Sequence, residues 1–197
     1  MIAVTLASQS ATRAAILRGA GLDFETVASG IDEGAVKPAL LEGGGTARSV
    51  AAELATLKAV AVSRTRPGLV IGADQTLDLD GGLCDKATDM GEARRRLMSL
   101  RGRTHSLHAA VVVAREGSAV WRLTDTVSLT MRAFSEAFLD GYLARAGEAA
   151  LSSVGGYQIE GEGAQLFEAM DGDYFSILGL PLLPLLEALR REGALPR

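Results

Sequence analysis

The sequence is short of cysteine, of positive charge and of long apolar runs, and each shortage excludes a class of protein. A single cysteine, Cys84, rules out an internal disulfide framework and a cysteine-rich metal site. A net charge of −4 argues against binding to a nucleic-acid polymer or a membrane surface, since such proteins usually present a basic face. No run has the pattern of a membrane span or a signal peptide, so we expect a cytoplasmic protein.

Several signatures of catalysis are missing as well. The sequence contains neither the GxxxxGK[ST] phosphate loop nor the GxSxG elbow of serine hydrolases. Its two histidines, His105 and His108, lie three residues apart in an expected strand, so they fall on opposite faces and are poor ligands for one metal ion. A small polyanionic substrate is still compatible with the acidic chain if its few cations converge at one place.

What is present is an alternation of strand-like and helix-like stretches in a chain of ordinary globular composition, 48% apolar and 22% charged. Hairpin turns are expected at Asp80–Gly82, at Arg115–Ser118 and at Asp171–Asp173, and a loop at Gly43–Gly45. Hairpins together with crossovers predict an α/β protein with a mixed twisted sheet and flanking helices. The expected strands are 2–6, 24–28, 69–73, 76–80, 105–114, 119–130, 165–170 and 174–178, and the expected helices are 10–18, 47–63, 91–99, 135–145 and 182–191.

The first strand-to-helix turn has the composition of an anion site. Ser8 and Ser10 follow the strand, Ser10 is a good helix N-cap, and Arg13 then falls at the third helical position. The helix dipole disfavours a cation there, so Arg13 is better explained by an adjacent anion, and free amides, hydroxyls and a guanidinium suit phosphate. An ordinary cap with a solvated arginine is the equally weighted alternative.

Two further charged residues follow apolar patterns. Asp74 comes directly after the apolar run 69–73, at the expected end of a buried strand, where open α/β sheets place ligands. Lys58 lies on a largely apolar helix face, so it either snorkels from the edge of the core or points into a cleft. The same placement predicts that neither Arg13 nor Lys58 contributes much to stability.

Two more candidates have weaker patterns. Asp32 and Glu33 form an acidic pair that could ligate Mg²⁺, although most such pairs are simply solvated. Lys86 lies in a loop after a hairpin, where a solvated surface lysine is the simpler interpretation.

Taken in order along the chain, these motifs resemble the Maf family of nucleoside triphosphate pyrophosphatases. The resemblance covers nearly the whole chain, and it rests on the ordered set more than on any one motif. The matching pieces are Leu6-Ala7-Ser8-Gln9-Ser10 with Arg13, Asp32-Glu33, Leu54-Ala55-Thr56-Leu57-Lys58-Ala59, Gly72-Ala73-Asp74-Gln75, Lys86, Gly102-Arg103-Thr104-His105, the stretch Gly156 to Ala164, Gly172-Asp173-Tyr174 and Gly179-Leu180-Pro181.

The resemblance implies a Maf/ITPase-like α/β fold, one domain over residues 1–197 with two lobes around a central cleft. It implies hydrolysis of a nucleoside triphosphate to the monophosphate and pyrophosphate, dependent on Mg²⁺ or another divalent metal. Ser8, Ser10 and Arg13 would bind phosphate oxygens, and Lys58 and Lys86 would neutralise phosphate charge. Glu33 and Asp74 would hold the metal, and Asp74 would orient or deprotonate the attacking water. A homodimer is implied by the resemblance alone.

Three positions, Thr12, Gln75 and Glu160, correspond to those that sort the family's substrates. Gln75 and Glu160 match the branch that resembles 7-methyl-GTP hydrolases, but Thr12 stands where that branch has an aromatic ring. We therefore expect a guanine-type base, in plain or modified form, with a pyrimidine substrate (dTTP or UTP) as the alternative. Ala11 and Ser153 replace a common proline and lysine, changes that affect loop stiffness and charge more than the reaction class.

Two rivals of other classes follow from the same residues. A nucleotide-binding regulator of cell division that has lost hydrolysis would need the cleft but not the complete set of charges. All of Arg13, Glu33, Lys58, Asp74 and Lys86 are present, which favours the enzyme. A phosphoribosyltransferase is a weaker rival, since no paired-acid motif precedes a Gly/Thr-rich phosphate loop.

Overall fold

The computed structural model describes residues 2–196, and its centre is one mixed seven-stranded sheet. The strands lie in the order β2-β1-β3-β5-β6-β7, and β4 pairs with β3. β2, β1 and β3 are parallel, whereas β3, β5, β6 and β7 are antiparallel neighbours. The strands are β1 (Val4–Leu6), β2 (Glu25–Thr26), β3 (Leu69–Leu79), β4 (Gly82–Cys84), β5 (Thr104–Arg115), β6 (Ser118–Met131) and β7 (Phe167–Asp171).

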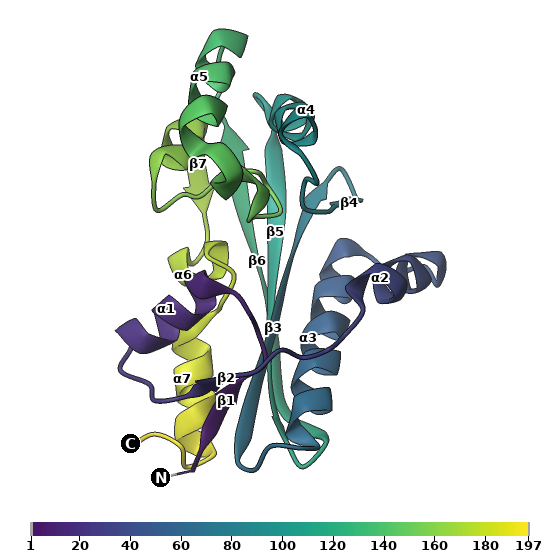
Figure 1. The fold of residues 1–197 in the computed structure, drawn as a ribbon, viewed down its shortest axis with the longest axis vertical. Helices are drawn as coiled ribbons and strands as arrows, with labels where there is room; N and C mark the ends of the chain where they lie inside the picture. Colours follow the sequence, from purple (N-terminus) through teal and green to yellow (C-terminus); the bar gives the residue numbers. More distant parts are fainter. Residues whose placement is uncertain (1, 197) are drawn as a thin grey trace.

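The helices cover the sheet differently in its two halves. The long strands β3, β5 and β6 run the length of the molecule, with α1, α6 and α7 on one side of its lower half, α3 on the other, and α4 and α5 at the top (Figure 1). The α-helices are α1 (Ala11–Gly19), α2 (Glu33–Glu42), α3 (Ala47–Ser63), α4 (Met90–Leu100), α5 (Glu136–Ala146), α6 (Tyr174–Ile177) and α7 (Leu182–Arg191), and the 3₁₀ turns are η1 (Gly147–Leu151) and η2 (Glu162–Leu166).

Small residues bring α3 unusually close to the sheet. Ala51, Ala55 and Ala59 pack against alanines and a valine of β5. A Cβ atom at Gly72 of β3 would lie 2.3 Å from the carbonyl oxygen of Ala55, so only glycine allows this approach. The close packing carries Lys58, on the same helix, to within reach of β3.

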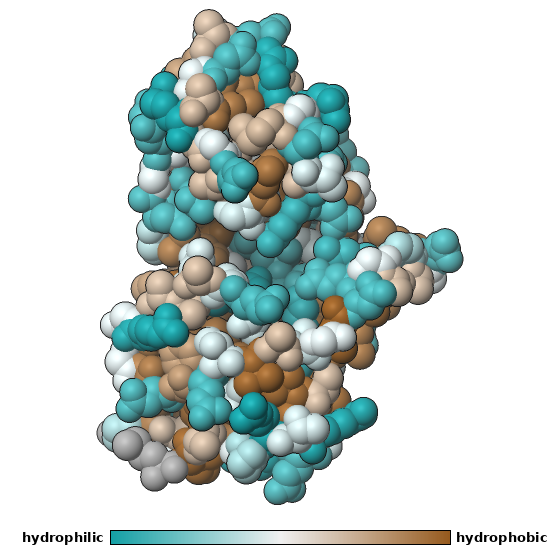
Figure 2. All heavy atoms as spheres, viewed as in Figure 1, coloured by the Kyte–Doolittle hydropathy of each residue, from teal (hydrophilic) through white to brown (hydrophobic). Residues whose placement is uncertain are grey.

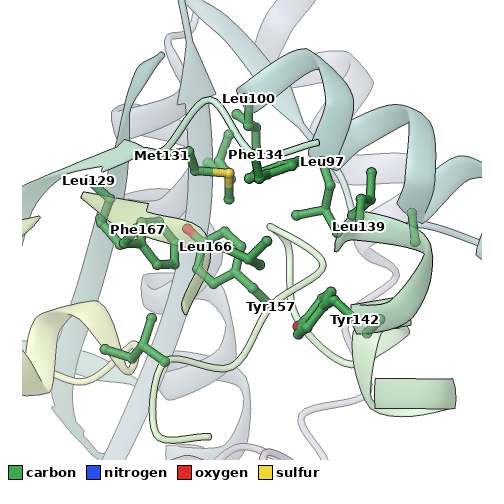
Figure 3. Close-up of a cluster of buried hydrophobic side chains, with 14 of the residues drawn as sticks. Leu97, Leu100, Leu129, Met131, Phe134, Leu139, Tyr142, Tyr157, Leu166 and Phe167 are labelled. Atoms are coloured by element: carbon green, nitrogen blue, oxygen red, sulfur yellow. The ribbon is translucent and has the colours of Figure 1, made fainter. Parts of the chain in front are cut away.

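The upper half has its own core of aliphatic and aromatic side chains from α4, α5, β5 and β6 and from the segments after them (Figure 3). Within it, the fully buried His105 of β5 is hydrogen-bonded through Nε2 to the hydroxyl of Tyr157 at 2.7 Å. Tyr157 also meets Phe167 edge-on, with ring centroids 4.7 Å apart. This packing fixes the loop of residues 152–160 at the base of the upper half.

The α/β class with a mixed sheet and all five expected helices are confirmed, helices 47–63 and 182–191 at their predicted ends. The predicted break between 69–73 and 76–80 is wrong, because β3 pairs with β5 in unbroken register from Val70 to Asp78. The predicted strand 174–178 is a helix, α6, because the side chain of Asp173 caps it by accepting from the amide of Ser176. Asp171–Asp173 therefore links a strand to a helix and is not a hairpin turn.

Four elements were not predicted: α2, β4, η1 and η2. The hairpins at Asp80–Gly82 and Arg115–Ser118 are confirmed. The expected domain spans residues 1–197, and its two terminal residues, Met1 and Arg197, lie outside the described residues. No helix within residues 2–196 is long and apolar enough to cross a bilayer.

Candidate active site

A cavity of about 1110 Å³ opens at mid-height of the molecule, between the start of α1, α2 and the loops of the upper half. Hydrophilic side chains gather at the corresponding recessed waist of the surface (Figure 2). The cavity lies where the chain leaves β1 at Ala7 while β3 continues, which is the kind of strand end at which α/β sheets bind ligands. All ten candidate residues line it: Ser8, Ser10, Thr12, Arg13, Glu33, Lys58, Asp74, Gln75, Lys86 and Glu160.

Lys58 is the centre of the charged cluster. Its Nζ lies 2.7 Å from Oδ1 of Asp74 and 2.5 Å from Oε1 of Glu33, and the residue is only 7% exposed. Of the two alternatives raised by the sequence, the lysine therefore points into the cavity and does not snorkel to the surface. Its position on α3 follows from the close packing at Gly72.

Asp74 lies in the middle of β3, not at a strand end as expected, but three residues beyond Ile71, the last residue to pair with β1. Its burial raises its pKa, although Lys58 and Arg13 act in the opposite direction. Burial also acts to raise the pKa of Glu33, but the hydrogen bonds and charges of Lys58 and Lys37 outweigh it and lower that pKa. The two carboxyl groups thus differ in acidity although they share one lysine.

Arg13 connects three segments around the cavity. Its Nε donates to the carbonyl oxygen of Gly179 at 2.9 Å, and its Nη1 donates to that of Ala73 at 3.0 Å. Both residues also have contacts that support the fold: Arg13 satisfies two backbone carbonyls, and Lys58 neutralises a buried carboxylate.

The serines at the start of α1 behave as a helix cap. The hydroxyl of Ser10 accepts from the amide of Arg13 at 3.3 Å, which confirms the N-cap, and the hydroxyl of Ser8 accepts from the amide of Ser10 at 3.2 Å. The N-terminal end of a nine-residue helix therefore points its amides and its dipole toward the cavity.

Lys37 is a cavity residue that sequence reasoning missed. Its Nζ lies 2.8 Å from Oδ1 of Asp85 and 3.2 Å from Oε2 of Glu33. Lys86, next to Asp85 in the chain, has its pKa lowered by burial and by the charge of Arg13. A signal was available, because the sequence has only three lysines and Lys37 follows Glu33 by one helical turn.

Two further residues of the cavity lining offer hydrogen-bond acceptors. The Nε2 of Gln75 donates to the carbonyl oxygens of Ser176 and Ile177 at 3.1 and 3.0 Å, which leaves its Oε1 for a ligand. Glu160 is exposed at the cavity wall, on the loop that Tyr157 anchors. The hydroxyl of Ser153 stiffens this loop by donating to the carbonyl of Tyr157 and accepting from its amide.

The carboxylates of Glu33 and Asp74 are the oxygen donors that a hard cation would need. Both reach the same lysine nitrogen, so their oxygens lie within about 5 Å of each other. Residues 2–196 hold no group of three or more acidic, histidine or cysteine ligands. The pair therefore fits a Mg²⁺ ion that completes its shell with water and substrate phosphates, which is how Mg²⁺ is commonly bound.

Known proteins similar to this chain include one matching family and relatives that align over nearly its whole length. A family model described as "Maf-like protein" matches residues 3–192. A protein of Caulobacter vibrioides named "Nucleoside triphosphate pyrophosphatase" is 58% identical over 98% of this chain and 96% of its own length. Two proteins named "7-methyl-GTP pyrophosphatase", from Brucella abortus and Mesorhizobium japonicum, are each 50% identical, over 97% and 98% of this chain and 96% and 97% of their own lengths.

Among solved structures, a HAM1 protein from Coxiella burnetii aligns with a TM-score of 0.44 at 17% identity, over 68% of this chain and 75% of that chain, which is a weak overall likeness.

Proposed function

The chain belongs to the Maf family and is a nucleoside triphosphate pyrophosphatase, and from this premise we propose which residues carry the reaction and which base the enzyme prefers. The observation that carries the proposal is the buried Lys58 held between Asp74 and Glu33 in a cavity that also contains Arg13 and Lys86. Such converging cations explain how an acidic protein binds a polyanion. The product pair is the nucleoside monophosphate and pyrophosphate.

The phosphates bind among the amides of α1, the hydroxyls of Ser8 and Ser10, and the cations. Lys58, Lys86 and Arg13 neutralise the negative charge that develops during transfer. Asp74 orients the attacking water and accepts its proton, a role that suits a carboxyl group whose pKa burial has raised. Glu33 and Asp74 would hold the divalent ion, and the ion would offset phosphate charge and polarise the attacked phosphorus.

The base is of the guanine type. The free acceptors of Gln75 and Glu160 suit the adjacent N1–H and N2–H₂ donors of guanine, whereas uracil and thymine offer one N–H between two carbonyls. Relatives from Brucella and Mesorhizobium named for 7-methyl-GTP support this choice. Because Thr12 provides no ring to stack on a methylated base, GTP itself is expected to compete well with 7-methyl-GTP.

The remaining parts of the proposal concern organisation. We expect one domain with two lobes that share the cavity, and a cytoplasmic location. We also expect a homodimer, which the resemblance to the Maf family implies. A pyrimidine substrate is the alternative within the family, and a regulator without hydrolysis is the alternative outside it.

The test of the mechanism is Asp74→Asn with pyrophosphate release as the readout. Turnover should fall by about 10²-fold or more, because the water loses its base while the amide keeps the side chain's shape. Asp78→Asn is the matched control, since Asp78 lies on the same strand outside the cavity lining, and it should hydrolyse like the parent. Near-parental turnover in a folded Asp74→Asn protein would remove Asp74 from the mechanism. Absence of pyrophosphate release from the parent with GTP, 7-methyl-GTP, UTP and dTTP would favour the regulator.

A further inference from the structure

The three lysines of the chain are not scattered over its surface. Lys37, Lys58 and Lys86 all line the same cavity. The other basic side chains, apart from two histidines, are arginines, and many of them are in surface ion pairs. Lysine is a compact cation that suits a phosphate group approached as a point charge. Lys58 and Lys86 already have roles in the proposed reaction, and Lys37 does not.

Lys37 belongs to a line of alternating charges that crosses the cavity. Asp74, Lys58, Glu33, Lys37 and Asp85 follow one another, with nitrogen–oxygen distances of 2.7, 2.5, 3.2 and 2.8 Å. The inner end of the line is buried and its outer end is exposed: the side chains are 8% exposed at Asp74, 9% at Lys58, 39% at Glu33, 20% at Lys37 and 57% at Asp85. The pair at the outer end is therefore the one that a ligand displaces most easily.

We propose that Lys37 is a further phosphate-binding residue, and that it exchanges its counter-ion Asp85 for the outer phosphates of the substrate. The inference rests on the proposed function, in which Asp74 and Lys58 act at the phosphorus that water attacks. Lys37 lies one carboxylate farther from Asp74, so it meets the part of the triphosphate that leaves as pyrophosphate. Asp85 then competes with the substrate for the same ammonium group.

The alternative is a structural latch, in which the pair merely holds α2 against the loop of Asp85. Other contacts already hold both parts. Asp32 caps α2, Glu33 ties the helix to Lys58, and Arg96 donates to the backbone carbonyl of Asp85 at 2.7 Å. Removing the Asp85 charge should therefore leave the loop in place, which makes the two explanations separable.

The experiment compares Lys37→Met with Asp85→Asn, and uses inorganic tripolyphosphate as the binding probe in calorimetry, beside steady-state hydrolysis of GTP. If Lys37 exchanges Asp85 for phosphate, the two variants should change KM and Kd in opposite directions. Lys37→Met should raise KM and the Kd for tripolyphosphate by roughly ten-fold, with kcat changed by less than about three-fold, since one charge contact near the surface is lost. Asp85→Asn should lower both constants, by roughly two- to five-fold, because the competitor is neutral. Lys37→Arg should stay near the parent, and Arg66→Met, which removes an exposed cation outside the cavity, should leave KM unchanged.

Weaker binding in both Lys37→Met and Asp85→Asn would overturn the exchange and establish the latch, and unchanged binding in Lys37→Met would overturn it as well. Labelling of the parent with an amine-directed reagent gives a measurement that needs no variant to fold. Saturating tripolyphosphate should protect Lys37 at least five-fold, as judged by mass spectrometry, and an unprotected Lys37 would contradict the proposal. A parent that binds tripolyphosphate through Lys37 but hydrolyses no nucleotide would refute the proposed function and leave the phosphate site standing.

Discussion

The inner and outer walls of the cavity are built in different ways. The inner wall consists of Asp74 on β3, Lys58 on α3 and Arg13 on α1, and these side chains are held by strand pairing, close helix packing and backbone carbonyls. The outer wall consists of α2, the loop at Asp85 and Lys86, and the loop of residues 152–160. Ion pairs and a cap hold the first two, and the third is anchored at Tyr157 while its end at Glu160 is exposed. We infer that the inner wall holds the central charges of the reaction, Asp74, Lys58 and Arg13. The outer wall adds Glu33 and Lys86 and carries the groups that recognise the outer phosphates and the base.

This division has a physical basis. Transition-state charge is stabilised best by groups that need not reorganise, so the cations around the attacked phosphorus belong on packed elements. Groups that bind the base or release pyrophosphate must be able to move, so they belong on segments with lower local stability. The difference between the walls should therefore appear as a difference in what each substitution does to folding and to substrate choice.

The largest expected effect is on the inner wall, from Lys58→Met. Asp74 would keep its buried position and lose the cation that neutralises it, so unfolding free energy should fall by about 3 kcal/mol or more. Activity should fall with it. The outer counterpart, Lys37→Met, breaks a partly exposed pair and should cost less than about 1 kcal/mol. Urea unfolding of both variants measures the contrast directly.

A double variant separates the lost charge pair from lost packing. Lys58→Met combined with Asp74→Asn removes both charges, so it should be more stable than Lys58→Met alone. If the double variant is less stable than either single one, the buried pair is not what holds the inner wall together, and packing at Gly72 and Ala55 would have to account for it.

The sequence predicts the inner wall much better than the outer one. The apolar run before Asp74 and the long amphipathic stretch around Lys58 reflect burial in the final fold, so hydrophobic pattern alone locates both residues. The hydrophobic pattern could not show that β3 continues past Asp74. The continuation depends on pairing with β5, in which Asp74 faces Ala110, 36 positions later in the chain.

The outer wall lacks such a pattern. α2 contains Pro38 and has no fully buried residue among those described, so its sequence shows neither a good helix interior nor an apolar stripe. Its helix is supported by Asp32 at the cap and by ion pairs whose partners, Lys58 and Asp85, are distant in the sequence. The four-residue helix α6 was mistaken for a strand for a similar reason, since four residues are too few to show a period.

A second, smaller effect on stability should appear as the pH falls, at His105, which supports the outer wall through its hydrogen bond to Tyr157. Burial lowers the pKa of His105 to about 4, below the ordinary value of 6.5 expected in the unfolded chain. The unfolded state then takes up the proton first, so this contribution to stability is complete above pH 6.5 and is lost as the pH falls toward 4. Between pH 7 and pH 5 the loss should be about 2 kcal/mol.

The control for this prediction removes both partners of the hydrogen bond. His105→Phe with Tyr157→Phe leaves no buried donor or acceptor from the pair, and its stability should depend less steeply on pH than the parent's over the same range. Equal slopes for the two proteins in urea unfolding between pH 7 and pH 5 would show that His105 does not carry the acid sensitivity.

The smallest expected effect is a change of base preference from Glu160→Gln, at the tip of the outer wall. Ionised Glu160 offers only acceptors, and the two free acceptors with Gln75 favour the donor edge of guanine and repel pyrimidine carbonyls. A glutamine adds a donor, so the ratio of kcat/KM for UTP or dTTP to that for GTP should rise by roughly ten-fold. Stability should hardly change because the side chain is exposed.

The measurement is kcat/KM for GTP, 7-methyl-GTP, UTP and dTTP with both proteins. Glu162→Gln, on the same segment but outside the cavity lining, is the matched control. A parent that already prefers a pyrimidine, or a ratio that stays fixed, would assign base reading to Thr12 and leave the hydrolysis itself on the inner wall.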